Sequence, residues 1–393
     1  MKSLMLNKNI SRRVESGHPW IFANEVNRGK ALDAAAKKGE IVDVYLHDKK
    51  YVGRGYINPD SQIMVRLLTR DKNEVIDEAF FYKRILQAWE YRKKIGYTEN
   101  CRLVFGEADE LPQLIIDKFN DYFVVQTLAF GIDIWKPAIV KALEKIFTPK
   151  GIYERNDVPV RELEGMEQQK GFLSEEFDTN IIIKENGLQF HVDIVNGQKT
   201  GYFLDQQDNR KAISNIVKDA TVLGAFSYTG SFEVSAAKFG AKSVIGYDIS
   251  QSAIDMCNKN ALLNGVQDIC NFECANAFDV LKGLTKENKQ WDVVLLDPPS
   301  FTKSRSSLEK AYAGYKEINL RGIKLVKPGG FLVTSSCTNL VKPEMFLDII
   351  GMAAKDAKRK IRQVVFNAQS PDHPIIRDQE YTNYLKFCIV QVL

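Results

Sequence analysis

The chain has 393 residues, 45% hydrophobic and 26% charged, which is long enough for two or three globular domains. We expect a cytoplasmic protein, because no signal-peptide pattern opens the sequence and no apolar run is long enough to span a bilayer. The six cysteines form no CxxC pair, which argues against a zinc knuckle or a disulfide framework and predicts reduced thiols. We expect no metal site.

Positive charge is concentrated at the N-terminal end. Residues 1–72 contain fourteen Lys and Arg against eight Asp and Glu, a net charge of +6, whereas the whole chain carries +4. This asymmetry favours a polyanion such as nucleic acid as the partner of the N-terminal end, although a solvated surface would carry the same charges.

Residues 1–72 contain short β-type runs separated by glycines, a pattern typical of a small β-barrel. Within SRRVESGHPWIFANEV, Arg12 and Arg13 precede Trp20 and Phe22, an interleaving that suits phosphate contact and base stacking. The two aromatic residues could equally belong to the barrel core, so the arginines are the stronger candidates for RNA binding. GHPWIFANEV and GRGYINPDSQIMVRLLT resemble a PUA domain, a small β-barrel of RNA-modifying enzymes.

Residues 73–185 are predicted to form an α+β middle domain. The stretch 74–97 has helical periodicity, and the pair Asn120-Asp121 separates two strand-like runs as a hairpin turn would. The acidic cluster at 107–110 is interpreted as a solvated loop rather than a metal site. With no catalytic constellation in view, this domain is expected to act as a spacer.

From residue 186 to 393 strand and helix patterns alternate, which predicts an α/β fold with a doubly wound sheet. The predicted strands lie at 221–227 and 243–248 and near 268–273, 291–297, 331–337, 362–367 and 383–391. Ahead of them, Asn186-Gly187 is a strong hairpin signal.

The loop from Ser227 to Gly230, between the first strand and its helix, and Asp248, at the end of the next strand, have the nucleotide-binding arrangement of Rossmann folds. Because the loop lacks GxGxxG, a nucleoside cofactor without phosphates fits best, and S-adenosylmethionine is such a cofactor. Asn276 follows the third strand, where its amide could contact adenine or simply cap the loop.

The run WDVVLLDPPSF places Asp297, Pro298 and Pro299 at the end of a predicted buried strand. Ligands bind at that edge of open α/β sheets, and a rigid proline turn with free carbonyls could hold a planar polar group. An ordinary strand exit would look the same. Lys199 and Thr200, in the polar and aromatic segment NGQKTGYFLDQQDNR, are further candidates for substrate binding.

Together, GQKTGYFLDQQDNR, FSYTGSF, YDIS, LLDPPSF and TSSCT resemble the large-subunit (23S) ribosomal RNA cytosine-5 methyltransferases that carry an N-terminal PUA domain. The resemblance covers essentially the whole chain. It implies a class I methyltransferase fold with an antiparallel last strand, S-adenosylmethionine as donor and C5 of a cytosine as acceptor. It also implies a substrate turn at 297–299, Cys337 as nucleophile, and cofactor contacts from Phe226, Ser227, Tyr228, Thr229, Gly230, Asp248, Asn276 and Asp297.

Three departures concern the cofactor contacts. Gly224-Ala225 replaces a more polar pair before FSYTG, Gln207 stands where a basic residue is common, and Asn276 occupies a position often filled by aspartate. None of these departures removes a reacting group.

The chemistry can also be argued from the residues. Cytosine C5 becomes nucleophilic once a thiolate adds to C6, and Cys337 and Asp297 end separate predicted strands at one edge. A protonated Asp297 could support N3 while Cys337 adds, although the sequence does not identify the base that removes the C5 proton. Cys337 could instead be a small buried residue, which is the favoured reading for Cys388 in LKFCIVQVL.

Two other functions stay open. The first is a methyltransferase that acts on a base nitrogen, for which the proline turn suffices without a cysteine. The second is a non-catalytic RNA-binding factor of ribosome assembly. In each case the expected partner is RNA, naked or in a partly assembled large subunit, because the target base must be flipped out. No membrane partner is expected, and a homodimer is left open.

Overall fold

The computed structural model describes residues 2–8, 12–27, 36–302 and 304–393. These residues divide into two compact units. The first unit comprises residues 1–181, 192–204 and 371–382, and the second comprises residues 182–191, 205–370 and 383–393. No helix in the described ranges is both long enough and apolar enough to cross a membrane.

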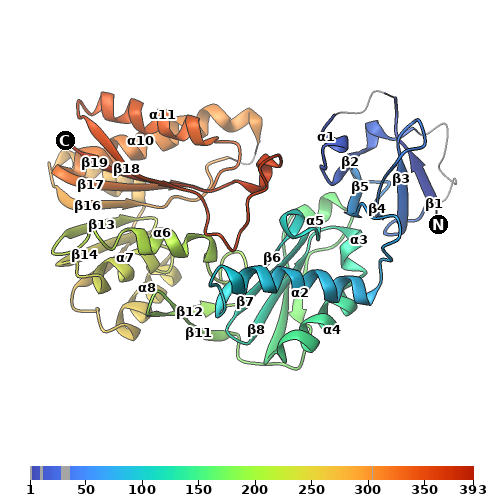
Figure 1. Ribbon diagram of the computed structural model, residues 1–393. Coiled ribbons are helices and arrows are strands. Elements are labelled where there is room, and N and C mark those ends of the chain that lie inside the picture. Colours follow the sequence, from blue (N-terminus) through green and yellow to red (C-terminus); the bar gives the residue numbers. More distant parts are fainter. Residues whose placement is uncertain (1, 9–11, 28–35, 303) are drawn as a thin grey trace. The chain divides into compact units, whose positions relative to one another are not determined.

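The first unit begins with a five-stranded sheet, drawn in blue in Figure 1, whose strand order is β1-β3-β4-β5-β2. Its elements are β1 (Lys2–Met5), α1 (Arg12–Glu15), β2 (Trp20–Phe22), η1 (Ala23–Glu25), β3 (Ile41–Tyr45), β4 (Tyr51–Ile57) and β5 (Ile63–Thr69). The close pairing of β4 and β5 requires Gly55, because a Cβ there would lie 2.0 Å from the carbonyl oxygen of Arg66. The β-rich pattern expected of the N-terminal region is confirmed.

A second sheet of the first unit has the order β10-β9-β8-β7-β6, and helices α2 and α4 pack on it (Figure 1). Its elements are α2 (Glu78–Lys94), β6 (Asn100–Phe105), η2 (Gly106–Asp109), β7 (Leu114–Phe119), β8 (Tyr122–Thr127), α3 (Phe130–Asp133), α4 (Lys136–Phe147), β9 (Gly151–Asn156), α5 (Val160–Leu163) and β10 (Gln169–Phe172). The hairpin expected at Asn120-Asp121 is confirmed, since β7 and β8 pair antiparallel across it.

A buried glutamate joins the two sheets of the first unit. The carboxylate of Glu164 accepts hydrogen bonds from Asn58 at 2.8 Å, Ser61 at 2.7 Å and Arg66 at 2.8 Å. Buried polar groups need such partners, and here all three come from β5 and the turn before it, whereas Glu164 itself lies between β9 and β10 of the second sheet. The boundary expected at residue 72 therefore lies inside one compact unit and stays a prediction about domains.

The acidic cluster at 107–110 differs from the solvated loop that the sequence suggests. The Glu107 carboxylate accepts a hydrogen bond from the Trp20 indole at 2.7 Å, and Asp109 binds the buried guanidinium of Arg92 at 2.8 Å. Only Glu110 is largely exposed, with 66% of its side chain accessible. The expectation fails because burial of the basic and aromatic partners depends on tertiary contacts.

The second unit is built on a seven-stranded sheet with the order β15-β14-β13-β16-β17-β19-β18. Its strands are β13 (Thr221–Ala225), β14 (Ser243–Asp248), β15 (Cys270–Cys274), β16 (Trp291–Leu296), β17 (Val326–Ser336), β18 (Ile361–Asn367) and β19 (Lys386–Val392). The strands from β15 to β17 pair in parallel, whereas β19 runs antiparallel to both of its neighbours. The doubly wound sheet with an antiparallel last strand is confirmed.

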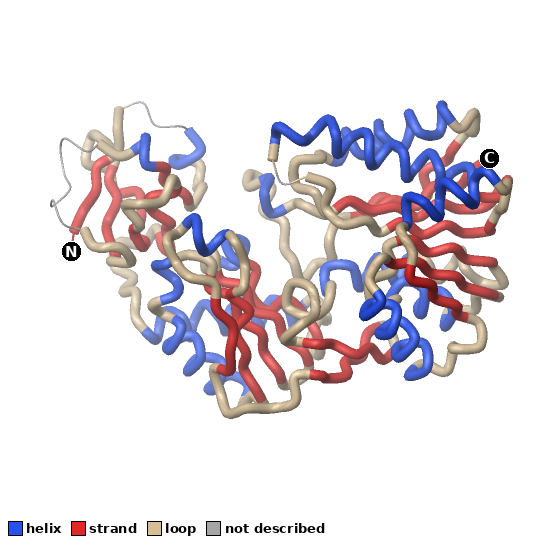
Figure 2. Tube along the Cα trace, turned by 180° about the vertical axis from the view of Figure 1, so that it is seen from behind, coloured by secondary structure: helices blue, strands red, loops and turns tan. Residues whose placement is uncertain are grey.

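Helices lie on both sides of this sheet (Figure 2). They are α6 (Gln207–Ala212), α7 (Ser231–Lys238), α8 (Gln251–Leu263), α9 (Ala277–Lys286), α10 (Leu308–Leu325) and α11 (Pro343–Asp356), with short turns η3 (Leu204–Gln206), η4 (Arg305–Ser307) and η5 (Glu380–Thr382) elsewhere in the chain. Strand β16 is central. Val293 to Leu296 are all at most 3% exposed, and Val294 and Leu296 belong to the hydrophobic cluster that contains Tyr315 and Phe346. Burial on both faces explains why this strand reads as a continuous apolar run.

A two-stranded sheet, β11 (Asn180–Glu185) and β12 (Leu188–Asp193), precedes the large sheet. Asn186 and Gly187 connect the two strands with φ values of 52° and 80°. Two consecutive left-handed residues make the tight turn that an Asn-Gly pair favours. The hairpin predicted from that pair is confirmed.

Candidate active site

Four predicted site segments meet at one edge of the seven-stranded sheet. Strands β13, β14, β16 and β17 are parallel neighbours, so their carboxyl ends lie on the same side. The chain leaves these ends at Phe226, Asp248, Asp297 and Cys337. This edge is the place where open α/β sheets bind ligands.

The loop after β13 has an unusual backbone. Phe226, Tyr228 and Gly230 have φ values of 67°, 49° and 72°. These values lie in the left-handed region, which residues other than glycine rarely adopt. Neighbouring elements hold the loop, since Asn260 Nδ2 donates to the Thr229 carbonyl at 2.9 Å and Cys257 Sγ donates to the Tyr228 carbonyl at 3.1 Å. Strain that the surroundings maintain in this way is typical of ligand-binding turns.

Asp248 orients this loop from the end of β14. Its Oδ2 accepts a hydrogen bond from the Tyr228 amide at 2.9 Å, and its Oδ1 accepts one from the Ser250 amide at 3.0 Å. Each carboxylate oxygen can accept a further hydrogen bond. Asp248 can therefore bind two vicinal hydroxyls while it holds the loop, as the ribose role requires.

Glu233 on α7 is a site residue that the sequence reasoning missed. It is 2% exposed, and its Oε1 accepts a hydrogen bond from Ser227 Oγ at 2.7 Å. A Cβ added to Gly224 would lie 2.1 Å from that oxygen, so Glu233 fills the space of the polar side chain expected at 224. Burial raises the pKa of Glu233 to about 7, and the negative charges of Asp297 and Asp248 act in the same direction. An acidic residue in a first helical turn is too common to be a signal.

We expect the Glu233→Gln variant to be more stable than the wild type above pH 7. The unfolded carboxyl ionises near pH 4.5 and the folded one near 7, so wild-type stability falls as the pH rises across that interval and stays low above it. The effect is at most about 3 kcal/mol.

Urea unfolding at pH 5 and pH 8 measures this difference. Glu309→Gln, at an exposed position of α10, should leave the pH dependence unchanged. A Glu233→Gln protein whose stability falls between pH 5 and pH 8 as much as the wild type's would contradict the assignment.

The substrate turn follows β16. Asp297 Oδ1 accepts a hydrogen bond from Gln206 Nε2 at 2.9 Å and another from Ser335 Oγ on β17. Pro298 is buried and Pro299 is exposed. Gln206, whose Oε1 accepts a hydrogen bond from Asn209 at 2.7 Å, was not predicted individually, although it lies in the polar segment that the sequence singles out.

Cys337 lies one residue beyond β17, which ends at Ser336 rather than at 337 as expected. The thiol residue is half-buried. The hydroxyl of the next residue, Thr338, is hydrogen-bonded to Ser300 at 3.0 Å and to Tyr315 at 2.7 Å, which ties the Cys337 segment to the proline turn. Cys388, by contrast, is fully buried in β19, and burial raises its pKa to about 12, which suits a packing residue.

Asn276 caps α9, with its side-chain oxygen accepting a hydrogen bond from the Phe278 amide at 2.9 Å. This is the capping arrangement that the sequence left open, and the amide nitrogen is still able to donate. Phe278 lies near Phe226 and Phe301, with ring centroids 5.8 and 5.7 Å away. These aromatic rings at the end of the cofactor loop offer an apolar surface for a nucleobase.

The predicted RNA-binding residues belong to the first unit. Arg12 is exposed, whereas the Arg13 guanidinium binds both oxygens of Glu25, at 2.8 and 2.7 Å. Thr200 Oγ1 donates to Asp117 at 2.5 Å, and the exposed Lys199 has its ammonium 4.4 Å from the centre of the Phe203 ring. Arg13 and Thr200 are therefore engaged in internal contacts, and Arg12 and Lys199 are the more accessible of the four.

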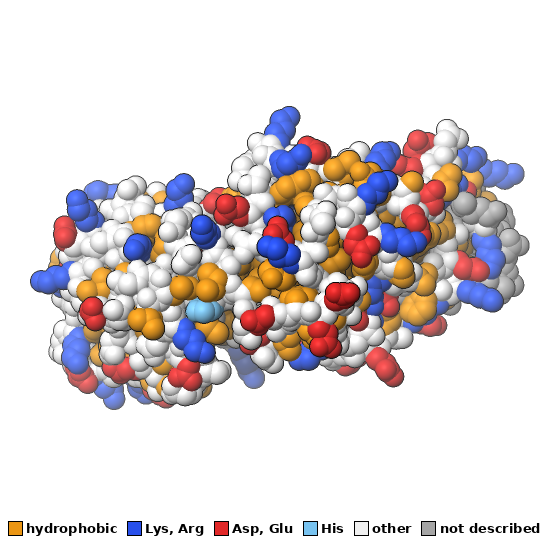
Figure 3. Space-filling view, turned by 90° about the horizontal axis from the view of Figure 1, so that it is seen from below, with side chains coloured by type: hydrophobic (Ala, Val, Ile, Leu, Met, Phe, Trp, Pro, Cys, Tyr) orange, Lys and Arg blue, Asp and Glu red, His pale blue; other side chains and the backbone are white. Residues whose placement is uncertain are grey.

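Trp20 also has an internal role. Its ring stacks on Tyr381, with centroids 4.3 Å apart and planes 17° apart. Trp20 is half-buried and lies outside the hydrophobic core of the N-terminal sheet, so its packing on Tyr381 differs from the core role that the sequence suggested. On the face drawn in Figure 3, basic side chains are interspersed with acidic ones, so the described residues form no continuous basic area there.

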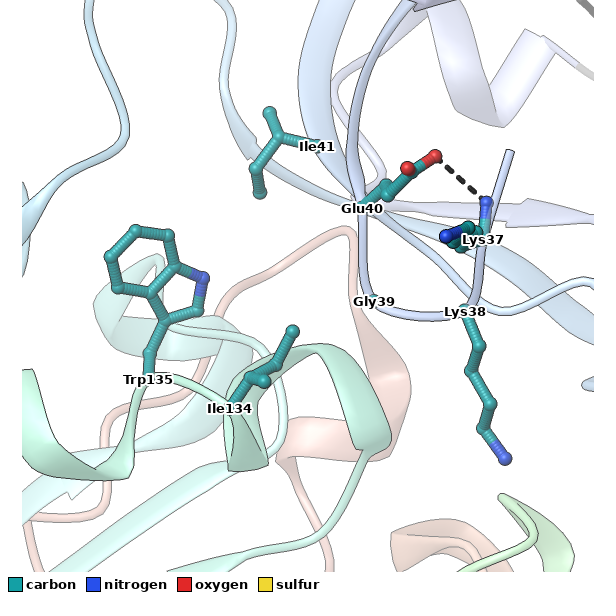
Figure 4. Close-up of a pocket in the computed structure, with 7 residues that line it drawn as sticks. All are labelled: Lys37, Lys38, Gly39, Glu40, Ile41, Ile134 and Trp135. Carbon is teal, nitrogen blue, oxygen red and sulfur yellow. Dashed lines mark hydrogen bonds between the residues drawn. The ribbon is translucent and has the colours of Figure 1, made fainter. Parts of the chain in front are cut away.

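A hollow of about 470 Å³ lies within the first unit, lined in part by Gly39, Glu40, Ile134 and Trp135 (Figure 4). Glu40 accepts a hydrogen bond from the Lys37 amide at 2.7 Å. The hollow contains none of the predicted site residues, and its only acidic side chain is already held by basic partners. We therefore do not assign chemistry to it.

The residues at the sheet edge fit S-adenosylmethionine. The hydroxyl of Thr229 is buried and has no hydrogen-bond partner among the described residues, so it can bind a polar ligand. Asp248 and Asp297 lie close enough to Glu233 to raise its pKa, so this edge gathers three carboxyl groups, which would favour a cofactor that carries a positive sulfonium. Gly230 keeps the loop against α8, because a Cβ there would lie 3.1 Å from Cys257.

Comparison with known proteins agrees with this fit. Residues 4–70 match the family described as PUA-like domain, and residues 165–378 match the S-adenosylmethionine-dependent methyltransferase family. Two solved structures resemble the whole chain at 21% identity, with full coverage of both chains, and show the shared fold. One is a protein from Streptococcus mutans described as a SAM-dependent methyltransferase, with a TM-score of 0.83, and the other is a methyltransferase complexed with S-adenosylhomocysteine, with a TM-score of 0.85.

Two curated relatives are similar along their full length. Ribosomal RNA large subunit methyltransferase I of Aliivibrio fischeri is 40% identical over 392 residues and is covered to 98%, as is this chain. The protein of the same name from Cronobacter sakazakii is 39% identical over 389 residues, with 98% of this chain and 97% of that protein covered. The chain therefore belongs to the ribosomal RNA large subunit methyltransferase I family of S-adenosylmethionine-dependent methyltransferases.

Proposed function

We propose that this protein methylates C5 of a cytosine in large-subunit ribosomal RNA through a covalent bond between Cys337 Sγ and C6 of the base. The observation that carries the proposal is the placement of Cys337 beside the Asp297 turn. Hydrogen bonds from Ser335 to Asp297 and between Ser300 and Thr338 join the two segments. A methyltransferase acting on a nitrogen would need the turn alone.

Each residue has a distinct part in this reaction. The Cys337 thiolate adds to C6, which makes C5 nucleophilic, and the Asp297 carboxyl stabilises the charge that develops at N3. Gln206 and Ser335 hold that carboxyl in place from two sides. When bound, S-adenosylmethionine supplies the electrophilic methyl group. Asp248 and the loop after β13 would bind and orient the cofactor.

RNA is the partner that fits the first unit. Its PUA-like sheet carries the positive end of the chain, and Arg12 and Lys199 are exposed cationic side chains that would contact phosphates. We infer that the reaction takes place in the cytoplasm, because ribosomal RNA is the proposed substrate and the relatives are named as ribosomal RNA large subunit methyltransferases. The target is 23S RNA that is naked or partly assembled, because the cytosine must leave its stack to be reached.

Nucleoside analysis tests this function. Ribosomal RNA from a strain that lacks the gene would be incubated with the protein and methyl-labelled S-adenosylmethionine, then digested to nucleosides. Labelled 5-methylcytidine is the expected product. An N-methylated nucleoside would replace the proposal with a nitrogen methyltransferase, and the absence of any labelled nucleoside would favour an assembly factor.

A further inference from the structure

Lys386, the first residue of β19, is a buried lysine whose amine is bound by backbone carbonyl groups. It is 1% exposed, and its Nζ donates to the carbonyl oxygens of Thr338 at 2.6 Å and Tyr384 at 2.8 Å. None of the described carboxylates forms an ion pair with it. Burying an ammonium among neutral groups is costly, so a neutral amine is the favoured form until an anion is present.

The neighbour that can become an anion is Cys337. In the pairing of β17 with β19, Lys386 lies opposite Ser336, and its Nζ binds the carbonyl of Thr338. Lys386 is thus paired through its backbone with the residue before Cys337 and bound through its amine to the residue after it. A neutral amine has two N–H groups, which the two carbonyls satisfy, and its lone pair is left to accept a proton.

The charges around Lys386 favour this exchange. Burial lowers the pKa of Lys386 to about 7. The positive charge of Lys342, ahead of α11, lowers this pKa further, whereas the negative charge of the Cys337 thiolate raises it. From α10, Tyr315 contributes a hydroxyl that is hydrogen-bonded to Thr338. Among these groups, only Cys337 can supply negative charge near neutral pH.

We propose that Lys386 is a positioning residue for the reaction: its amine accepts the proton of the Cys337 thiol and then holds the thiolate as its counter-ion. The proton passes from Sγ to Nζ, so the S–H bond breaks as an N–H bond forms and no other reactant is needed. When the thiolate leaves C6 at the end of the cycle, the same proton can return to it. The inference rests on the proposed function in taking Cys337 as the nucleophile.

Alkylation of Cys337 by iodoacetamide measures this pair in the full-length protein without RNA or cofactor. Only the thiolate reacts, so the rate, mapped to each cysteine by mass spectrometry, follows its formation with pH. In the wild type we expect the Cys337 rate to reach half its maximum at least one pH unit below about 8.5, the value of a free cysteine. The exposed Cys274 serves as the internal reference.

Two substitutions separate the electrostatic role from a purely structural one. Lys386→Met should slow Cys337 alkylation at pH 7 at least about tenfold and leave Cys274 unchanged, because one pH unit corresponds to a factor of ten. Lys386→Arg keeps the positive charge and should keep the fast rate. Lys324→Met, at an exposed position of α10, is the matched control and should have no effect.

Several results would overturn the inference. The first is a wild-type Cys337 whose alkylation rate reaches half its maximum at about pH 8.5 or above. This result needs no variant, so it would overturn the inference even if Lys386→Met fails to fold. The second is a folded Lys386→Met protein in which Cys337 is alkylated as fast as in the wild type. The third is a folded Lys386→Arg protein in which Cys337 is alkylated as slowly as in Lys386→Met. Because these assays involve no methyl transfer, their failure is distinct from a failure of nucleoside analysis to find 5-methylcytidine.

Discussion

Cys337→Ala is expected to abolish methyl transfer while the affinities for S-adenosylmethionine and RNA stay nearly unchanged. The thiol contributes little to ground-state binding, but without its addition to C6 the C5 carbon cannot attack the methyl group. Removal of a covalent nucleophile costs orders of magnitude, so we expect kcat to fall at least about 10³-fold. Turnover assays with methyl-labelled cofactor, together with calorimetric titration of cofactor and RNA, measure both parts.

Cys388→Ala is the matched control for this substitution. Cys388 is fully buried in β19, so its removal should lower the free energy of unfolding without changing kcat. RNA that carries 5-fluorocytosine at the target gives a second readout, since the fluorine cannot leave as a proton and the covalent adduct should persist on a denaturing gel. The same adduct formed by Cys337→Ala would show that another residue is the nucleophile.

Asp297→Asn should lower kcat by about 10² to 10⁴, the range for a lost acid–base group. The substitution preserves the shape and leaves an oxygen that can accept from Gln206 and Ser335, but an amide cannot deliver a proton to N3. The RNA affinity should change little, because the loss falls mainly on the transition state. Single-turnover rates with saturating cofactor report this loss directly.

Asp292, at the other end of β16, provides the matched control. Despite partial burial, hydrogen bonds from Thr221 and Lys327 lower the pKa of Asp292 to about 2, so Asp292→Asn should reduce stability above pH 4 and leave kcat unchanged. A value of kcat for Asp297→Asn within about threefold of the wild type would remove Asp297 from the chemistry.

The layout of the second unit was predictable because its signals are local. Strands β13, β14 and β16 are largely apolar runs that end in turns, and the loop at 227–230, Asp248 and Asp297 lie at the ends of these runs. In the first unit, β1 and β2 have four and three residues and show no period that the sequence could reveal. Strands and turns can be predicted from the sequence where the residues of one segment alone show the pattern.

Glu233 and Lys386 could not be found in this way. Glu233 is buried because Gly224, nine positions earlier, leaves room for its carboxyl. Lys386 is buried because β19 pairs with β17, some fifty residues away in the chain. A charged residue looks the same in the sequence whether solvent or the protein interior surrounds it, so only the tertiary structure identifies these two.

The place of β19 in the sheet has a consequence for biosynthesis. β19 lies between β17 and β18, although it is made after both of them. During translation, Cys337 leaves the ribosome about fifty residues before Lys386. Until β19 has been made, the edges of β17 and β18 that pair with it have no partner strand. A nascent chain that stops before residue 386 would therefore lack the strand that joins β17 to β18, and with it the Lys386 amine proposed to act on the Cys337 thiol. In this protein, reactivity toward RNA would arise only when translation has delivered the last strand.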